Sequence, residues 1–190
     1  MSQTIAEIYA KLLPFIGKEY TLPITKNKGL PGLFLEELLG IPHTSNCLDC
    51  SDGELKIFPL EKKYGILRPK ETIAVTMLST DDLRVNDFKA SKCYKKMSKM
   101  LIVPYLRTDD TICYMAPKII DKDCKEYFEL YTILESDYNE IRKNYLESGI
   151  LESKTGVLLQ NRTKGAGHGS TSRAFYLRPE FMKRCVPLSS

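Results

Sequence analysis

The sequence lacks any apolar run that approaches the roughly 18–20 residues of a bilayer-spanning helix, which excludes an integral membrane protein. The amino-terminal stretch lacks the basic region and the small-residue cleavage site of a signal peptide, so we expect none. The chain also lacks internal repeats, low-complexity tracts and long linkers rich in Pro, Gly and Ser. We therefore expect a single domain that spans residues 1–190.

Charge of one sign is not in large excess. The 28 Lys and Arg residues against 24 Asp and Glu give a net charge of +4, which neither requires nor excludes a nucleic-acid partner. Hydrophobic residues make up 43% of the chain and charged residues 27%, a composition typical of a globular protein and too apolar for a disordered one.

The cysteines do not form the pattern of a disulfide framework. Six of them are scattered along the chain, which indicates reduced thiols and a cytoplasmic or otherwise intracellular protein. Cys47 and Cys50 have the spacing of a zinc knuckle, with His43 four residues before Cys47. No second closely spaced pair completes a set of four ligands, so we expect free thiols rather than zinc.

Apolar spacing predicts an ordered succession of helices and strands. Helices are expected at residues 4–17, 33–40, 88–99 and 122–147. Strands are expected at residues 54–60, 72–78, 101–105, 111–116, 157–160 and 174–177. The first two strands should pair antiparallel across the charged stretch between them. This mixture predicts an α/β fold with a central mixed β-sheet flanked by helices.

The segment from Asp49 to Lys56 carries the clearest chemical signal. Glu54 and Lys56 are two residues apart and therefore project from the same face of a strand, and Asp49 precedes them across a bend. Two carboxylates can hold Mg²⁺, which lowers the pKa of a bound water and stabilises charge on a phosphoryl group. A neighbouring lysine can orient the attacking water and balance developing negative charge.

Alternatives remain open for this segment. The spacing also occurs by chance, and an exposed Glu–Lys pair on a strand is often only solvated surface. Asp52 competes with Asp49 as a ligand, although the pair Asp52-Gly53 is well suited to a turn.

A longer pattern resembles a known family. The stretch Lys28-Gly29-Leu30-Pro31-Gly32-Leu33-Phe34-Leu35-Glu36, followed by Asp49 and Glu54-Leu55-Lys56, is similar to the MutH family. That family includes the methyl-directed mismatch-repair nickase and GATC-cutting type II restriction endonucleases, and it has the PD-(D/E)xK nuclease fold. Further similar segments lie at residues 88–104, 156–164 and 175–177. The resemblance implies a nuclease core at about residues 20–120 and DNA-recognition elements at about residues 155–180.

The resemblance also implies roles in catalysis. Asp49 and Glu54 would bind Mg²⁺, with Mn²⁺ able to substitute, and Lys56 would lie next to the scissile phosphate. Glu36 would be a supporting carboxylate, and Lys96 an additional active-site lysine. Glu36 and its neighbour Glu37 have the alternative of solvated helix surface, and Lys96 that of a basic helix face that contacts phosphates.

Four DNA-contacting residues follow from the same resemblance: Lys28, Arg162, Lys164 and Tyr176. The segment 161–173 independently reads as a nucleic-acid element, because it combines three basic residues, Arg173 among them, with small and hydrogen-bonding residues. A flexible solvated loop is the alternative for this segment, and an ordinary core position is the alternative for Tyr176.

These observations predict a Mg²⁺-dependent, site-specific endonuclease of double-stranded DNA. A type II restriction enzyme is the first interpretation, because the tail after Tyr176 lacks the apolar helical ending through which the repair enzyme meets its activator. Such an enzyme needs a companion methyltransferase, and a homodimer would let it cut both strands. A mismatch-repair nickase of hemimethylated sites is the second interpretation. A catalytically silent DNA-binding module is the third, although the presence of Asp49, Glu54 and Lys56 together argues against it.

Overall fold

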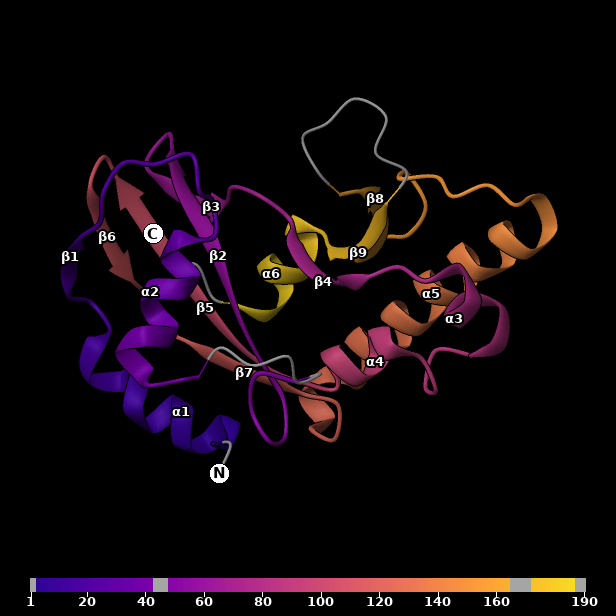
Figure 1. The fold of residues 1–190 in the computed structure, drawn as a ribbon, viewed down its shortest axis with the longest axis horizontal. Helices are drawn as coiled ribbons and strands as arrows, with labels where there is room; N and C mark the ends of the chain where they lie inside the picture. The colour runs from indigo at the N-terminus through magenta and orange to yellow at the C-terminus, as the bar shows by residue number, and fades with distance from the viewer. Residues whose placement is uncertain (1–2, 43–47, 165–171, 187–190) are drawn as a thin grey trace. The chain divides into compact units, whose positions relative to one another are not determined.

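A computed structural model describes residues 3–42, 48–164 and 172–186 (Figure 1). The chain forms two compact units. The first comprises Met1–Glu71, Lys99–Ile120 and Cys185–Ser190, and the second comprises Thr72–Ser98 and Asp121–Arg184. Within the described ranges, no helix combines the length and the apolar character needed to cross a membrane.

The first unit is built on a six-stranded mixed sheet. Its strands run in the order β1 (Glu19–Thr21), β6 (Thr111–Tyr114), β5 (Lys99–Thr108), β2 (Glu54–Lys63) and β3 (Ile66–Pro69), and β7 (Lys118–Asp121) also pairs with β5. β2 and β5 are parallel, with Glu54 opposite Met100, whereas β2 and β3 are antiparallel. The expected α/β fold with a central mixed sheet is confirmed.

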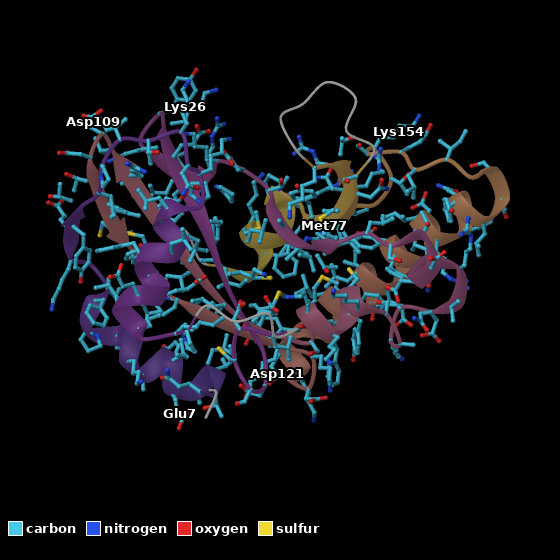
Figure 2. All side chains as sticks on the ribbon, in the orientation of Figure 1. Glu7, Lys26, Met77, Asp109, Asp121 and Lys154 are labelled. Carbon is cyan, nitrogen blue, oxygen red and sulfur yellow. The ribbon has the colours of Figure 1, made fainter. Side chains whose placement is uncertain are left out.

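Two helices lie side by side against β5 and β2 in this unit (Figure 1). α1 (Ile5–Leu12) carries Glu7 in its first turn (Figure 2). The helix begins at Thr4, whose hydroxyl accepts from the Glu7 N–H while the Glu7 carboxylate accepts from the Thr4 N–H. It continues into the 3₁₀ helix η1 (Leu13–Phe15). α2 (Leu30–Leu39) ends at Gly40, whose positive φ of 64° suits a residue without a Cβ.

The core between the helices and the sheet sets the direction of the β2 side chains. Leu55 packs in this core with Leu101 and Val103 of β5 and with Leu35 of α2, and Ile57 borders it. Because side chains alternate along a strand, Glu54 and Lys56 project from the opposite face of the sheet.

The second unit contains an antiparallel sheet of three strands in the order β4 (Ile73–Met77), β9 (Arg173–Leu177) and β8 (Leu159–Thr163). α5 (Phe128–Ser148) packs against β8, and its Tyr138 ring stacks on Phe175 of β9 at 5.6 Å between centroids. The remaining helices are α3 (Thr80–Val85), α4 (Lys92–Met97), η2 (Lys125–Tyr127) and α6 (Pro179–Cys185).

The expected pairing of residues 54–60 with 72–78 is wrong. β2 instead continues to Lys63 and turns directly into β3, while β4 belongs to the sheet of the second unit. The turn is made by Tyr64 and Gly65, whose φ angles of 53° and 83° are both positive. Two such residues form the tight turn that matches the twist of antiparallel strands, so the charged stretch is a hairpin rather than a connection.

The carboxyl-terminal tail, for which no apolar helical ending is expected, contains a helix with buried apolar side chains. A short helix, α6, forms there, and the side chains of Phe181 and Met182 are fully buried.

Candidate functional site

The candidate site lies at the start of β2, directly after a tight turn. The Cys50 N–H donates to the Gly53 carbonyl at 3.0 Å and closes this turn. A Cβ on Gly53 would lie 2.5 Å from the Lys99 carbonyl oxygen and 2.8 Å from the Ile5 side chain. Only glycine therefore lets the turn approach β5 closely enough to begin the parallel pairing at Glu54.

Glu54 and Lys56 meet on one face of β2, as their spacing predicts. Lys56 Nζ lies 2.7 Å from Glu54 Oε2. The Glu54 side chain is fully buried and that of Lys56 is 17% exposed, so this ion pair is largely shielded from solvent. A buried carboxylate requires such compensation, because desolvation disfavours its charge.

Asp49 lies beside the same strand end. Its Oδ2 accepts a hydrogen bond from the Leu55 N–H at 3.1 Å, which holds an exposed carboxylate next to the Glu54 backbone. The structure thus brings Asp49, Glu54 and Lys56 together.

Asp52, the competing candidate, is engaged elsewhere. Its Oδ1 accepts from the Ile5 N–H at 2.7 Å, at the start of α1, and its Oδ2 from Lys99 Nζ at 2.8 Å. Desolvation raises the pKa of this carboxyl group, but the hydrogen bonds from Lys99 and Ile5 outweigh it and hold the pKa below its ordinary value. These contacts give Asp52 a role in joining α1, the turn and β5.

The pKa of the Cys50 thiol is raised by the surroundings of this turn. Burial, followed by the nearby carboxylates Asp49, Asp52 and Glu54, raises the pKa of Cys50 to about 12. The thiol therefore stays protonated near neutral pH and is a poor metal ligand.

Glu36 is in the same unit, on α2, and is half-buried. It follows Gly32 by one helical turn, and a Cβ on Gly32 would lie 3.6 Å from the Ile57 side chain of β2. Glu36 therefore lies on the face of α2 that is directed toward β2. Among the described residues, no three His, Cys, Asp or Glu side chains form a metal-binding group.

Lys96 belongs to the second unit, on α4, where Cys93 and Met97 form the buried side of the helix. Lys96 is half-buried, whereas Lys92 and Lys95 are exposed.

Three of the predicted DNA-contacting residues share one face of the second unit's sheet. Gln160 pairs with Tyr176 and Arg162 with Ala174, so Arg162 and Tyr176 are diagonal neighbours on one face. The Arg162 guanidinium lies 5.8 Å from the centroid of the Tyr176 ring, a cation–π contact. Lys164 lies one residue beyond β8, and its N–H still bonds to the Ser172 carbonyl. Because side chains alternate along a strand, Lys164 lies on the same face as Arg162. The opposite face, with Phe175, packs toward α5.

Arg173 is different from the other basic residues of segment 161–173. Its Nε donates to Asn161 Oδ1 at 2.6 Å and its Nη2 to Ser153 Oγ at 3.0 Å, and Asn161 is only 1% exposed. These bonds tie β9 to β8 and to the segment before it, so Arg173 has a role in the fold. Residues 165–171 lie outside the described residues.

Lys28 lies in the first unit, just before α2. Its side chain is 82% exposed and its Nζ is 2.9 Å from Glu71 Oε1, so it is available at the surface. The candidate zinc ligands His43 and Cys47 lie outside the described residues.

One supporting residue was missed at the sequence level. Asp137 of α5 is 3% exposed, and its carboxylate accepts from the N–H groups of Val157, Leu158 and Leu159 at 2.6–2.8 Å. This cluster fixes the entry into β8, the strand that carries Arg162. An aspartate in an amphipathic helix is usually a solvated surface residue. The only sign of its role in the sequence is that a charged residue stands on the apolar face of the helix, next to Leu134, Tyr138 and Ile141.

Residues 45–144 match the family described as DNA mismatch repair enzyme MutH, which is more than half of the chain. The chain belongs to the MutH family. No curated protein gives a significant match. The MutH family has the PD-(D/E)xK restriction-endonuclease fold, in agreement with the mixed sheet of the first unit.

Membership of the MutH family makes the chain a DNA endonuclease of the MutH and restriction-enzyme type. The matched range contains Asp49, Glu54, Lys56 and Lys96. It does not reach Glu36 or the four predicted DNA-contacting residues, Lys28, Arg162, Lys164 and Tyr176.

Proposed function

We propose that this MutH-family chain is a site-specific endonuclease of double-stranded DNA, and specifically a type II restriction enzyme that cuts a short site such as GATC. The observation that carries the proposal is the arrangement at the start of β2. Asp49 is held beside the strand by the Leu55 N–H, and the buried Glu54 carboxylate pairs with Lys56 at 2.7 Å.

Asp49 and Glu54 fit a hard divalent cation, because both are carboxylates at one strand end and carboxylate oxygens are the ligands that such ions take. We propose Mg²⁺ as the resident ion, with Mn²⁺ as a substitute. When bound, such an ion supplies Lewis-acid stabilisation of the phosphoryl group and a more acidic water. Glu36 is proposed as a supporting carboxylate on the resemblance of its motif to the MutH family, and it lies half-buried in the same unit as Asp49 and Glu54.

Lys56 has two tasks in this proposal. Its ammonium group balances the Glu54 carboxylate in a largely buried environment, and it holds a positive charge where negative charge develops on the scissile phosphate. It also orients the attacking water by donating a hydrogen bond. Lys96 is proposed as the additional lysine of the active site.

Recognition of DNA is assigned to the shared face of β8 and β9. Arg162 and Lys164 present positive charge, and Tyr176 presents a ring against which the Arg162 guanidinium is already positioned. Lys28 is proposed to contact phosphate from the first unit. The two units would act as one endonuclease domain, with a homodimer cutting both strands and a companion methyltransferase protecting host DNA.

The proposal is tested with plasmid DNA free of methylation, beside the same plasmid methylated at GATC, in Mg²⁺. Discrete fragments from the unmethylated plasmid are expected, and sequencing of their ends gives the recognition site. Intact plasmid in both reactions, with Mn²⁺ also tried, would instead support a catalytically silent DNA-binding module.

A second function is favoured by the name of the matched family, DNA mismatch repair enzyme. In this alternative the chain nicks only the unmethylated strand of hemimethylated sites. Duplexes that are unmodified, hemimethylated or fully methylated separate the two functions. The restriction proposal predicts cleavage of both strands of the unmodified duplex without any added protein, whereas cleavage only in the presence of a repair activator would contradict it.

The burial of Phe181 and Met182 in α6 favours the restriction enzyme, because those apolar side chains offer no exposed surface to an activator.

A further inference from the structure

The hairpin between β2 and β3 presents an exposed aromatic side chain at a strained position. Tyr64 is 92% exposed and has a φ of 53°, in the left-handed region that disfavours a bulky side chain. Tight turns of this kind favour Asn or Asp before Gly. A tyrosine therefore gains nothing for the fold here, either from burial or from backbone geometry.

The surroundings of Tyr64 are basic and partly apolar. Lys62 and Lys63 directly precede it and are exposed, and Lys63 Nζ lies 5.6 Å from the centroid of the Tyr64 ring. On the other side of the turn, Ile66 is 60% exposed. Further along the hairpin, Arg68 and Glu61 form an ion pair, so the positive charge is concentrated toward the turn.

Protection of the sheet edge accounts for only part of this composition. Lys62 and Lys63 lie at the end of β2, beyond Leu60, the last residue of β2 that pairs with β5. Lysines beside such an unpaired edge prevent pairing with other chains. Exposed aromatic and aliphatic side chains have the opposite effect. The combination of lysines with an exposed ring is instead the chemistry of a nucleic-acid surface, in which lysines neutralise phosphates and a ring packs against the backbone sugars.

The position of the hairpin fits duplex DNA that extends away from the cut site. Lys28, a proposed phosphate contact, is ion-paired with Glu71, which lies just after β3. β2 runs from Glu54 to the turn (Figure 1), and at about 3.3 Å per residue Tyr64 lies on the order of 30 Å from the candidate site. A duplex aligned with β2 covers this distance in about nine base pairs at 3.4 Å per base pair.

We propose that the hairpin tip formed by Lys62, Lys63 and Tyr64 binds the DNA duplex flanking the recognition site. This inference rests on the proposed function. It adds a contact that does not read the recognised bases but anchors the enzyme on DNA about nine base pairs from the cut.

Two variants test the hairpin tip. Tyr64→Asn removes the ring and suits the left-handed φ, so it should fold at least as well as the wild type. The double variant Lys62→Gln/Lys63→Gln removes two charges from exposed positions. Lys11→Gln is the matched control, because Lys11 is an exposed lysine of the first unit in the last turn of α1.

Binding is measured by fluorescence anisotropy with Ca²⁺ in place of Mg²⁺, on duplexes of 12 and 40 base pairs that carry the mapped site at their centre. Tyr64→Asn should weaken binding to the long duplex about fivefold, because the apolar area buried by the ring is lost, and should leave the short duplex unchanged. The double lysine variant should lower the slope of log affinity against log salt by about two on the long duplex only. Lys11→Gln should change neither quantity.

The outcomes separate this inference from the proposed function. Wild-type affinity of both hairpin variants for the long duplex, in an enzyme that still cuts its site, overturns the inference alone. A shift in oligomeric state, measured by sedimentation, with unchanged DNA affinity would assign the hairpin to contact between copies of the chain and also overturn it. If the wild-type protein neither binds nor cuts DNA, the proposed function itself fails, and the inference fails with it.

Discussion

Asp49 and Asp52 lie in the same turn, yet their side chains have different surroundings. Asp52 serves the fold through the Ile5 N–H and Lys99, whereas Asp49 is exposed and held only beside the start of β2 by the Leu55 N–H. The sequence favours Asp49 over Asp52 as a metal ligand only because Asp52-Gly53 suits a turn, since the path of the chain between the two residues depends on how Gly53 meets β5. That contact is tertiary and has no local signal.

This difference predicts opposite effects of two conservative substitutions. Asp52→Asn should destabilise the protein by about 1–2 kcal/mol, because it weakens a charged hydrogen bond at the start of α1, and should leave cleavage largely intact. Asp49→Asn should leave stability nearly unchanged and abolish cleavage. Urea denaturation and plasmid cleavage measure the two properties, and loss of cleavage in Asp52→Asn at full folding would reverse the assignment.

The stability effect of Asp52 should depend on pH. The folded-state pKa of its carboxyl group lies below the ordinary value of 3.8. Its stabilising contribution is therefore fully present above that value and is lost as the pH falls through the lower folded-state pKa. The difference in free energy of unfolding between wild type and Asp52→Asn should be constant from pH 5 to 7 and shrink in acid.

The Glu54–Lys56 pair predicts a sharper functional effect. Glu54→Gln retains the volume of a fully buried side chain but loses its charge, so cleavage should fall by about a hundredfold or more. Lys56→Met, which keeps the aliphatic stem, should have a similar effect. Both variants should keep most of their DNA affinity in Ca²⁺, and wild-type cleavage by either would show that the site lies elsewhere.

Among the elements, α5 supports β8, a strand that packs against it and that carries the proposed DNA contact Arg162. Its Asp137 carboxylate accepts three backbone N–H groups that lead into β8, which carries Arg162. Helical periodicity predicts the helix itself, and its core residues Leu134, Tyr138 and Ile141 follow that periodicity. The role of Asp137 could not be predicted, because it depends on a chain segment about twenty residues away.

Asp137→Ala should therefore be among the most destabilising single substitutions in the second unit. Removal of the carboxylate leaves buried N–H groups without an acceptor, at a cost of about 3 kcal/mol or more. Glu140→Gln, at an exposed position on the same helix, is the control and should change the free energy of unfolding very little. Equal urea midpoints for the two variants would contradict this role.

The pairing of the strands could not be predicted from the local sequence pattern. The sequence correctly placed a strand at Glu54 and another near Ile73, but it paired them with each other. Their actual partners depend on the turn at Tyr64 and Gly65, and tyrosine is a rare residue at positive φ. Tyr64 gives no sequence signal for a tight turn, which is why the hairpin was not predicted. It also motivates the proposed DNA contact, because a residue that is unfavourable for the local backbone indicates a functional role.

For the whole molecule, the proposed function raises the question of how the one proposed set of Asp49, Glu54 and Lys56 per chain would act on two strands. The strands of a duplex are antiparallel, so a two-fold symmetric dimer would present one set to each strand. We expect a single-site supercoiled plasmid to become linear with little accumulation of nicked circles, at a rate that rises more steeply than linearly with protein concentration. Mixing wild type with a large excess of Glu54→Gln should then convert the product to nicked circles, because mixed dimers hold one working site. The same mixture made with Lys11→Gln should still yield linear DNA. Nicked circles as the end product of the wild type alone would instead support the repair nickase, since an enzyme that acts on one strand needs only one site.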